Sequence, residues 1–287
     1  GVASVNVDLT NDAPGAGGSM DSVTINDGAL RSYATLAGVS ISTGGGVDTL
    51  ILNETSYLNA GGFDVLTIDL GDGTDRVQAS DPTVTGDADL SVSDTQLSLN
   101  DGVATGNVTL NNFTTAGRGE DVTLTGGAGD NTFDVSGHTG EVDVAGAGGT
   151  DTLTGQNATD ATWTFTADDA GTARDDADPA GTVNFNLIEE FIGGTGNDTF
   201  VVGTFTIADI DGGTGTNTLD ITGAGTGRAV TLTAARTGTA AVVTAFDNIT
   251  DITSTGGANT LTGADLDSAW TIDGATGSVT VAGQTLN

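Results

Sequence analysis

The chain has 287 residues, of which 39 are Asp or Glu and only 6 are Lys or Arg, so its formal net charge is −33. This balance leaves no basic surface for binding phosphates, which excludes nucleic acid as a partner. The absence of cysteine excludes disulfides and thiolate metal sites, and no apolar run approaches the roughly 20 residues of a membrane-spanning helix.

Nearly all of the acidic residues are aspartate, and the chain also holds 46 glycines. High charge with low hydrophobicity is typical of disordered chains, or of folds whose charge is neutralised by bound cations or salt. Aspartate suits both tight turns and hard cations, so we expect the folded alternative. The chain begins at Gly1 without a methionine, which indicates that a leader or a larger precursor has been removed.

Short segments of alternating apolar and polar residues recur from one end of the chain to the other. In chain order, examples are Val65–Leu70, Thr132–Val135, Thr218–Ile221 and Ser278–Val281, and each is followed closely by a glycine. Lysine is absent and methionine occurs once, so good helix formers are rare. We therefore expect an all-β fold with many strands of about four to six residues.

A glycine-rich motif repeats along the chain. Its clearest copies are 126–134, 193–201 and 212–220, and looser copies centre on Asp48–Leu50, Asp75–Val77, Asp151–Leu153 and Asn259–Leu261. The sequence spacing is 20 from Asn131 to Asp151 (151 − 131), 19 from Asp198 to Asn217 (217 − 198), and 42, or two periods, from Asn217 to Asn259 (259 − 217). This period predicts a parallel β-solenoid (a β-helix or β-roll) with about 19–21 residues per coil, because coils of one length stack and share a core. Asn131 and Asp151 should then lie on adjacent coils, as should Asp198 and Asn217.

The repeat is interrupted twice. Residues 78–125 carry no clear copy, and residues 156–190 contain an acidic run from Asp168 to Asp178. Irregular coils, side hairpins or a boundary between two solenoids would each explain these gaps. We expect an N-terminal solenoid part at 1–160, an irregular acidic interruption at 161–192 and a C-terminal solenoid part at 193–287, with one continuous domain as the alternative.

The copies resemble the glycine- and aspartate-rich repeats of RTX (hemolysin-type) proteins, whose pattern is G-G-x-G-x-D-x-U-x with U apolar. Residues 193–201 match every position, whereas 212–220 have Asn217 in place of the aspartate. The resemblance implies a parallel β-roll with calcium between stacked turns, and secretion, often as surface-layer proteins and large adhesins. RTX copies follow one another directly, whereas these recur once per predicted coil. A right-handed β-helix with uncharged Asn and Thr ladders is therefore the alternative.

Calcium is the predicted cofactor, and the candidate metal ligands are the corner aspartates, with turn carbonyls completing the coordination. These candidates are Asp48, Asp75, Asp130, Asp151 and Asp198. Two stacked aspartates without a cation would repel each other by about 3 kcal/mol at a separation of roughly 5 Å and an effective dielectric constant of about 20. The alternative is that these aspartates only cap turns.

These features predict an extracellular structural or adhesive protein of a cell surface, which self-assembles into a surface layer, a filament or an adhesin stalk, and not an enzyme. The expected partners are copies of itself or neighbouring surface-protein domains, with cell-surface polysaccharide as a further candidate. One alternative is a carbohydrate-active β-helix (a polysaccharide hydrolase or lyase) that uses Asp168, Asp169, Asp175 and Asp176, with Arg174 as the nearby basic residue. A minor alternative is an ice-binding solenoid with an array of threonine pairs, namely Thr164/Thr166, Thr204/Thr206, Thr231/Thr233 and Thr260/Thr262.

Overall fold

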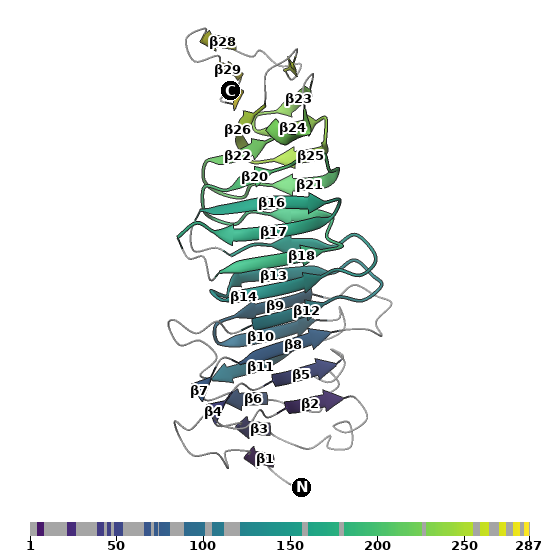
Figure 1. The fold of residues 1–287 in the computed structure, drawn as a ribbon, viewed down its shortest axis with the longest axis vertical. Helices are drawn as coiled ribbons and strands as arrows, with labels where there is room; N and C mark the ends of the chain where they lie inside the picture. Colours follow the sequence, from purple (N-terminus) through teal and green to yellow (C-terminus); the bar gives the residue numbers. More distant parts are fainter. Residues whose placement is uncertain are drawn as a thin grey trace. The chain divides into compact units, whose positions relative to one another are not determined.

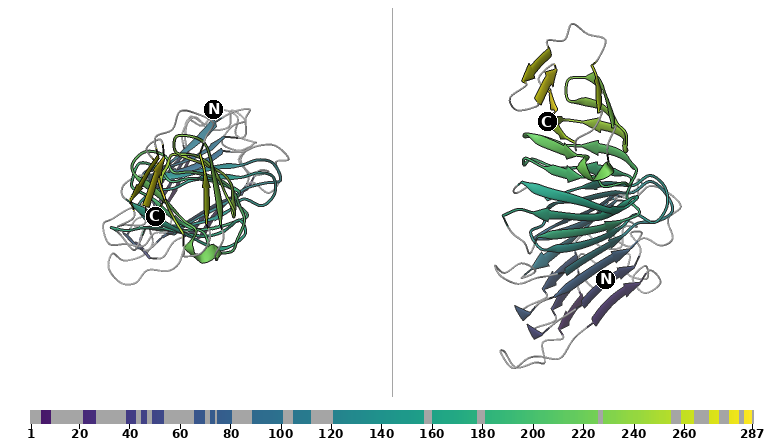
Figure 2. Two further views of the ribbon diagram at one scale, coloured as in Figure 1. Left: turned by 90° about the horizontal axis from the view of Figure 1, so that it is seen from above. Right: turned by 45° about the horizontal axis from the view of Figure 1, so that its top comes forward.

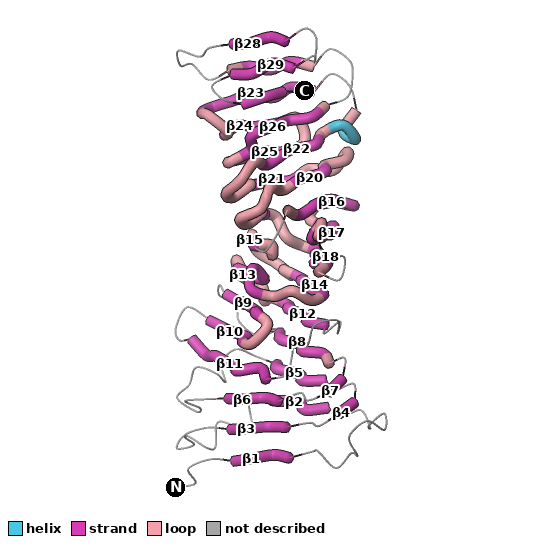
Figure 3. Tube along the Cα trace, turned by 90° about the vertical axis from the view of Figure 1, so that its left-hand side faces the viewer, coloured by secondary structure: helices cyan, strands magenta, loops and turns pink. Residues whose placement is uncertain are grey.

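The structure is a computed structural model, and it describes residues 5–8, 22–26, 39–42, 45–46, 49–53, 66–69, 72–73, 75–80, 89–100, 105–111, 121–156, 160–177, 181–225, 228–254, 259–263, 270–273, 278–281 and 284–286. The chain divides into two compact units, Gly1–Asp151 and Thr152–Asn287. The described residues are all-β, as predicted, apart from one 3₁₀ turn, η2 (Thr222–Ala224), which is cyan in Figure 3 and green at the outside of the second unit in Figure 2. In each unit the strands belong to two large sheets that combine parallel and antiparallel pairs. Among the residues that the structure describes, no helix is long and apolar enough to cross a bilayer.

The first unit contains two large sheets and one short strand pair (Figure 1). The first sheet has the spatial order β1 (Val5–Asp8), β3 (Val39–Ser42), β6 (Leu66–Asp69), β11 (Thr105–Asn111), β10 (Gln96–Asn100), β9 (Asp89–Ser93) and β13 (Thr132–Gly137). The second has the order β2 (Ser22–Asn26), β5 (Thr49–Asn53), β8 (Arg76–Ser80), β12 (Asp121–Thr125) and β14 (Glu141–Ala145). The short pair is β4 (Gly45–Gly46) with β7 (Asp72–Gly73).

The second unit repeats this division into two sheets. Its first sheet has the order β15 (Thr152–Thr154), β19 (Glu190–Ile192), β21 (Ile207–Asp211), β25 (Val243–Asp247), β24 (Thr237–Ala240), β23 (Ala229–Ala234) and β27 (Thr260–Thr262). Its second has the order β18 (Thr182–Asn186), β17 (Ala170–Asp175), β16 (Ala161–Ala167), β20 (Thr199–Val201), β22 (Asn217–Asp220), β26 (Ile249–Thr253), β30 (Gln284–Leu286), β29 (Ser278–Val281) and β28 (Trp270–Asp273).

The alternating sequence pattern places one face of each strand in the core. In β12, Val122 and Leu124 are buried while the residues on either side of them are half-buried. Parallel pairing sets Val122 beside Val77 of β8 and beside Val142 of β14, so that the same apolar position is stacked from strand to strand. Burial of each such side chain contributes about 1.5–3 kcal/mol, so the stack stabilises the pairing of these strands.

Aromatic side chains fill the core of the second unit. Trp163 of β16 is fully buried and stacks on Phe200 of β20, with ring centroids 5.5 Å apart. Phe191 of β19, which belongs to the other sheet, packs edge-to-face with Phe165 and with Trp163. The ring centroids are 4.9 Å and 5.8 Å apart, respectively. These contacts between strands of both sheets join the two sheets of this unit.

The parallel registers vary in length. Thr199 of β20 pairs with Thr218 of β22, a sequence step of 19 (218 − 199), and Asp121 of β12 pairs with Glu141 of β14, a step of 20 (141 − 121). The step is longer between β5 and β8, where Thr49 pairs with Arg76 and the difference is 27 (76 − 49). The predicted period of 19–21 residues therefore holds around the clearest motif copies. It does not hold between β5 and β8, which overlap the first two looser copies.

Antiparallel triplets of strands account for the interruptions and for the longest steps. They are β9–β10–β11 in the first unit and β16–β17–β18, β23–β24–β25 and β28–β29–β30 in the second. Short turns link the first two strands in three of them, at residues 94–95, 168–169 and 235–236.

The β23–β25 triplet lies between Asn217 and Asn259, so the interval between these two residues is not two regular periods, and that prediction was wrong. The inserted strand β23 buries Val230 and Leu232 in the core. The extra length therefore extends the sheet with a hairpin and does not form a second coil.

Candidate functional site

The predicted calcium ligands that the structure describes lie at corners where a turn enters a strand. Asp75, Asp151 and Asp198 are each only 1% exposed, whereas Asp130 is exposed. Asp48 lies outside the described residues. The corners therefore differ strongly in how well water reaches the carboxylate.

Successive corners of the first unit are joined by a reciprocal pair of hydrogen bonds. The backbone N–H of Asn131 donates to Asp151 Oδ1 at 2.7 Å, and the backbone N–H of Thr150 donates to Asp130 Oδ1 at 2.7 Å. Each bond spans 20 residues of sequence. We call this pair of opposed side-chain-to-backbone bonds a corner staple. It confirms the prediction that Asn131 and Asp151 are neighbours.

The second unit repeats the corner staple. The N–H of Asp198 donates to Asn217 Oδ1 at 2.9 Å, and the N–H of Thr216 donates to Asn197 Oδ1 at 2.8 Å, both across 19 residues. A further staple joins 160–161 to 197–198, because Ala161 N–H donates to Asp198 Oδ1 at 3.0 Å and Asn197 N–H donates to Asp160 Oδ1 at 2.8 Å. The predicted contact between Asp198 and Asn217 is thus confirmed.

The glycines of the motif leave room for these staples. A Cβ on Gly193 would lie 2.5 Å from Asp198 Oδ2, and a Cβ on Gly212 would lie 2.6 Å from Asn217 Nδ2. Gly213 adopts φ +72°, and a Cβ there would lie 2.2 Å from the carbonyl oxygen of Gly194 on the neighbouring turn. The first glycine is therefore required by the corner side chain, and the second by the close approach of two turns.

Asp198 has an unusual electrostatic environment. Burial, together with the charges of Asp160 and Asp176, raises its pKa to about 7, although the hydrogen bond from Ala161 opposes this shift. Its Oδ2 is buried without a hydrogen-bond partner in the described structure, whereas the corresponding Nδ2 of Asn217 donates to Asn248 O at 3.1 Å. The corner of Asp198 therefore favours an added proton or cation over a bare carboxylate.

No group of three or more Asp, Glu, His or Cys side chains within the described ranges is arranged to hold a metal ion. The corner staples bring Asp130 and Asp151 onto adjacent turns, and Asp198 lies near Asp160 and Asp176. Any cation at these corners would therefore depend on turn carbonyls for most of its ligands. Calcium at Asp48, Asp75, Asp130, Asp151 and Asp198 stays a prediction.

A polar hollow of about 560 Å³ opens on the β16–β17 hairpin. Its lining residues are Thr162, Thr164, Thr172, Arg174, Asp175 and Asp176. Within it, Thr162 Oγ1 donates to Asp176 Oδ1 at 3.0 Å. The hollow therefore offers guanidinium and hydroxyl donors beside carboxylate acceptors.

Of the four acidic residues considered for hydrolysis, Asp175 and Asp176 line this hollow and Asp168 and Asp169 do not. Asp168 and Asp169 form the turn before β17, and Asp175 and Asp176 lie at its other end. A strand of this length separates the two pairs by about 20 Å. Two catalytic carboxylates of a glycosidase are about 5–10 Å apart, so one residue from each pair cannot act on the same bond.

The threonine pairs lie on different sheets and not in one array. Thr164 and Thr166 are in β16, Thr231 and Thr233 are in β23 of the other sheet, and Thr204 and Thr206 lie outside strands. Among these pairs, pairing between strands brings Thr231 of β23 beside Thr262 of β27. A single flat surface built from all four pairs is therefore not formed.

An acidic face on the second unit was not anticipated from the sequence. Glu190 pairs with Asp209, and Asp211 pairs with Asp247, across the parallel strands β19, β21 and β25. Burial, and then the charges of Asp247 and Glu190, raise the pKa of Asp209. The Asp209–Asp211 alternation around buried Ile210 was a visible signal, but only the register between strands reveals that the carboxylates are adjacent.

A comparison of the chain with protein-family models, with curated proteins and with solved structures found no match. Its function is therefore inferred from the corners, the hollow and the acidic face.

Proposed function

We propose that the chain is an extracellular structural or adhesive surface protein, built as a parallel β-solenoid that assembles into a surface layer, a filament or an adhesin stalk. The observation that carries this proposal is the corner staple, which recurs in both units. Each of these bond pairs holds one turn of the chain against a neighbouring turn. The residues of the repeated motif therefore serve to stack the turns. Stacked turns with a shared apolar core give a stiff element that suits a mechanical role.

Sheet ends supply a means of assembly. β1 pairs with β3, and the described strands provide no neighbour for its other edge. An open edge presents unpaired N–H and C=O groups that can pair with another chain. We propose that copies of the protein, or neighbouring surface-protein domains, associate through such edges.

Calcium completes the proposal. The support is the large excess of aspartate and the unsatisfied Oδ2 of buried Asp198, which needs a positive partner when it is ionised. The candidate ligands are Asp48, Asp75, Asp130, Asp151 and Asp198. A bound cation at these turns would neutralise carboxylates that otherwise repel each other.

Thermal melting with calcium and with a chelator, followed by electron microscopy of the same samples, tests this function. We expect calcium to raise the melting temperature and the micrographs to show ordered filaments or layers. An equal concentration of magnesium is the control for general screening, since Mg²⁺ demands a tighter octahedral site. An unchanged melting temperature on chelation would remove calcium from the proposal, and dispersed single particles under all conditions would remove self-assembly.

The hollow favours a second candidate function, which is carbohydrate binding or cleavage. Arg174 is exposed and lines the hollow together with three threonines and two aspartates. We expect Arg174→Ala to weaken any binding of acidic polysaccharides by at least about tenfold, since a charge-assisted bond to a carboxylate is worth about 1.5–3 kcal/mol. Arg236→Ala, at an exposed arginine in another turn, is the matched control. Equal binding by both variants, or no binding by the parent protein, would exclude this function.

A further inference from the structure

His138 is the one histidine of the chain, and its position between Gly137 and Thr139 suggests a simple loop residue. It does lie outside a strand, directly after β13, but only 1% of its surface is exposed. The protonation of histidine changes within the physiological pH range, so the groups around this buried imidazole decide its charge.

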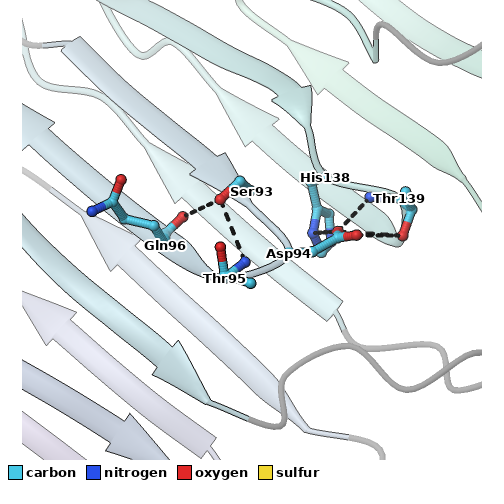
Figure 4. A network of polar contacts seen from close by, with 6 residues as sticks. All are labelled: Ser93, Asp94, Thr95, Gln96, His138 and Thr139. Carbon is cyan, nitrogen blue, oxygen red and sulfur yellow. Dashed lines mark hydrogen bonds and ion pairs between the residues drawn. The ribbon is translucent and has the colours of Figure 1, made fainter.

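That environment is the turn between β9 and β10. His138 Nδ1 lies 3.2 Å from Asp94 Oδ1, and the backbone N–H of Thr139 donates to the same oxygen at 2.9 Å (Figure 4). Thr139 Oγ1 lies 3.2 Å from both carboxylate oxygens. In return, the N–H of Asp94 donates to Gly137 O at 3.1 Å. We call this set of contacts the 94–138 clasp.

Further contacts hold each side of the clasp. In the β9–β10 turn, Ser93 Oγ accepts from the N–H of Thr95 at 3.4 Å and donates to Gln96 O at 3.3 Å (Figure 4). On the β13 side, the register with β9 shifts between Asp134 and Gly137, as in a β-bulge. A Cβ on Gly137 would lie 2.8 Å from Ser93 Cβ, so the two segments are in close contact.

Burial lowers the pKa of His138, and the charge of Asp94 and its hydrogen bond to the imidazole offset this effect only in part. Asp94 is a charged group that lies against the imidazole. The folded state therefore favours the neutral imidazole. The stability that this contributes is present above the usual pKa of histidine, about 6.5, and is lost as the pH falls through the folded-state value.

We propose that the 94–138 clasp is an acid-sensitive latch, in which protonation of His138 releases the β9–β10 turn from the end of β13. In acidic surroundings the β9–β10–β11 triplet would keep its own antiparallel pairing but lose this anchor. The inference concerns one turn of the first unit and does not depend on the proposed function.

Titration of the full chain by NMR tests the latch, because its single histidine gives one imidazole Hε1 signal. We expect a titration midpoint below 6.5, and we expect the protection of the Asp94 and Thr139 amides from hydrogen exchange to fall between about pH 7 and about pH 5. A midpoint at or above 6.5 would mean that the ion pair with Asp94 stabilises the protonated form, and would overturn the proposal.

Two variants separate the latch from general acid unfolding. Asp94→Asn keeps an acceptor for Thr139 but removes the charge, so the midpoint should move further down. His138→Gln cannot titrate, so amide protection at positions 94 and 139 should become independent of pH over this range. If His138→Gln kept the same loss of protection at low pH, other carboxylates would be responsible and the latch would be refuted.

Discussion

At the scale of the residue, the asparagines of the motif are structural parts of the turn. Asn217 is fully buried, accepts from the N–H of Asp198 and donates through Nδ2 to Asn248 O. Its amide therefore serves the turns on both sides. An ionised aspartate at the same position could accept but not donate, so asparagine is needed for both bonds.

Asn217→Ala should lower the free energy of unfolding of the second unit by about 2–3 kcal/mol, because it leaves the buried N–H of Asp198 without a partner and removes the bond to Asn248 O. Thr216→Ala is the matched control. Thr216 is exposed and contributes its backbone N–H to the corner staple, so its replacement should cost less than about 0.5 kcal/mol. Urea denaturation of both variants measures the difference, and equal stabilities would show that the staple contributes little.

At the scale of the element, prediction from sequence succeeded where local pattern and stacking agree. The alternating segment 132–135 lies within β13, and the segment 218–221 overlaps β22. The corner residues are hydrogen-bonded as expected, residue 131 to residue 151 and residue 198 to residue 217. The motif reveals these contacts because a glycine turn and an apolar inward residue recur together. The candidate site was less predictable, since the hollow and the acidic face depend on which strands become neighbours.

The antiparallel triplets could not be located from the motif. β23 and β24 have the same alternating threonine-rich sequence as the parallel strands, and their turn is Ala235-Arg236, without glycine or asparagine. Arg236 nonetheless adopts φ +63°, and the register shifts between Leu232 and Ala234, as in a hairpin that closes with a bulge. Tertiary pairing therefore overrides the local preference of the turn. The interval from Asn217 to Asn259 alone cannot distinguish two coils from one coil with an added hairpin.

At the scale of the whole molecule, the net charge of −33 opposes compaction through self-repulsion. The acidic face concentrates part of it, because like charges are directly opposite each other in neighbouring strands. Burial, and then these like charges, raise the pKa of Asp209. The stability linked to this group is fully present below the usual pKa of aspartate and is lost as the pH rises through the raised folded-state value.

Raising NaCl from about 10 mM to about 0.5 M should therefore raise the melting temperature at neutral pH, because the screening length shrinks from about 30 Å to a few ångströms. Asp209→Asn should stabilise the protein at low salt and reduce this salt dependence. Asp220→Asn is the matched control, since Asp220 of β22 pairs with the uncharged neighbours Val201 and Thr253. If both variants responded to salt like the parent protein, repulsion at the acidic face would not limit stability. The charge would then act through the molecule as a whole.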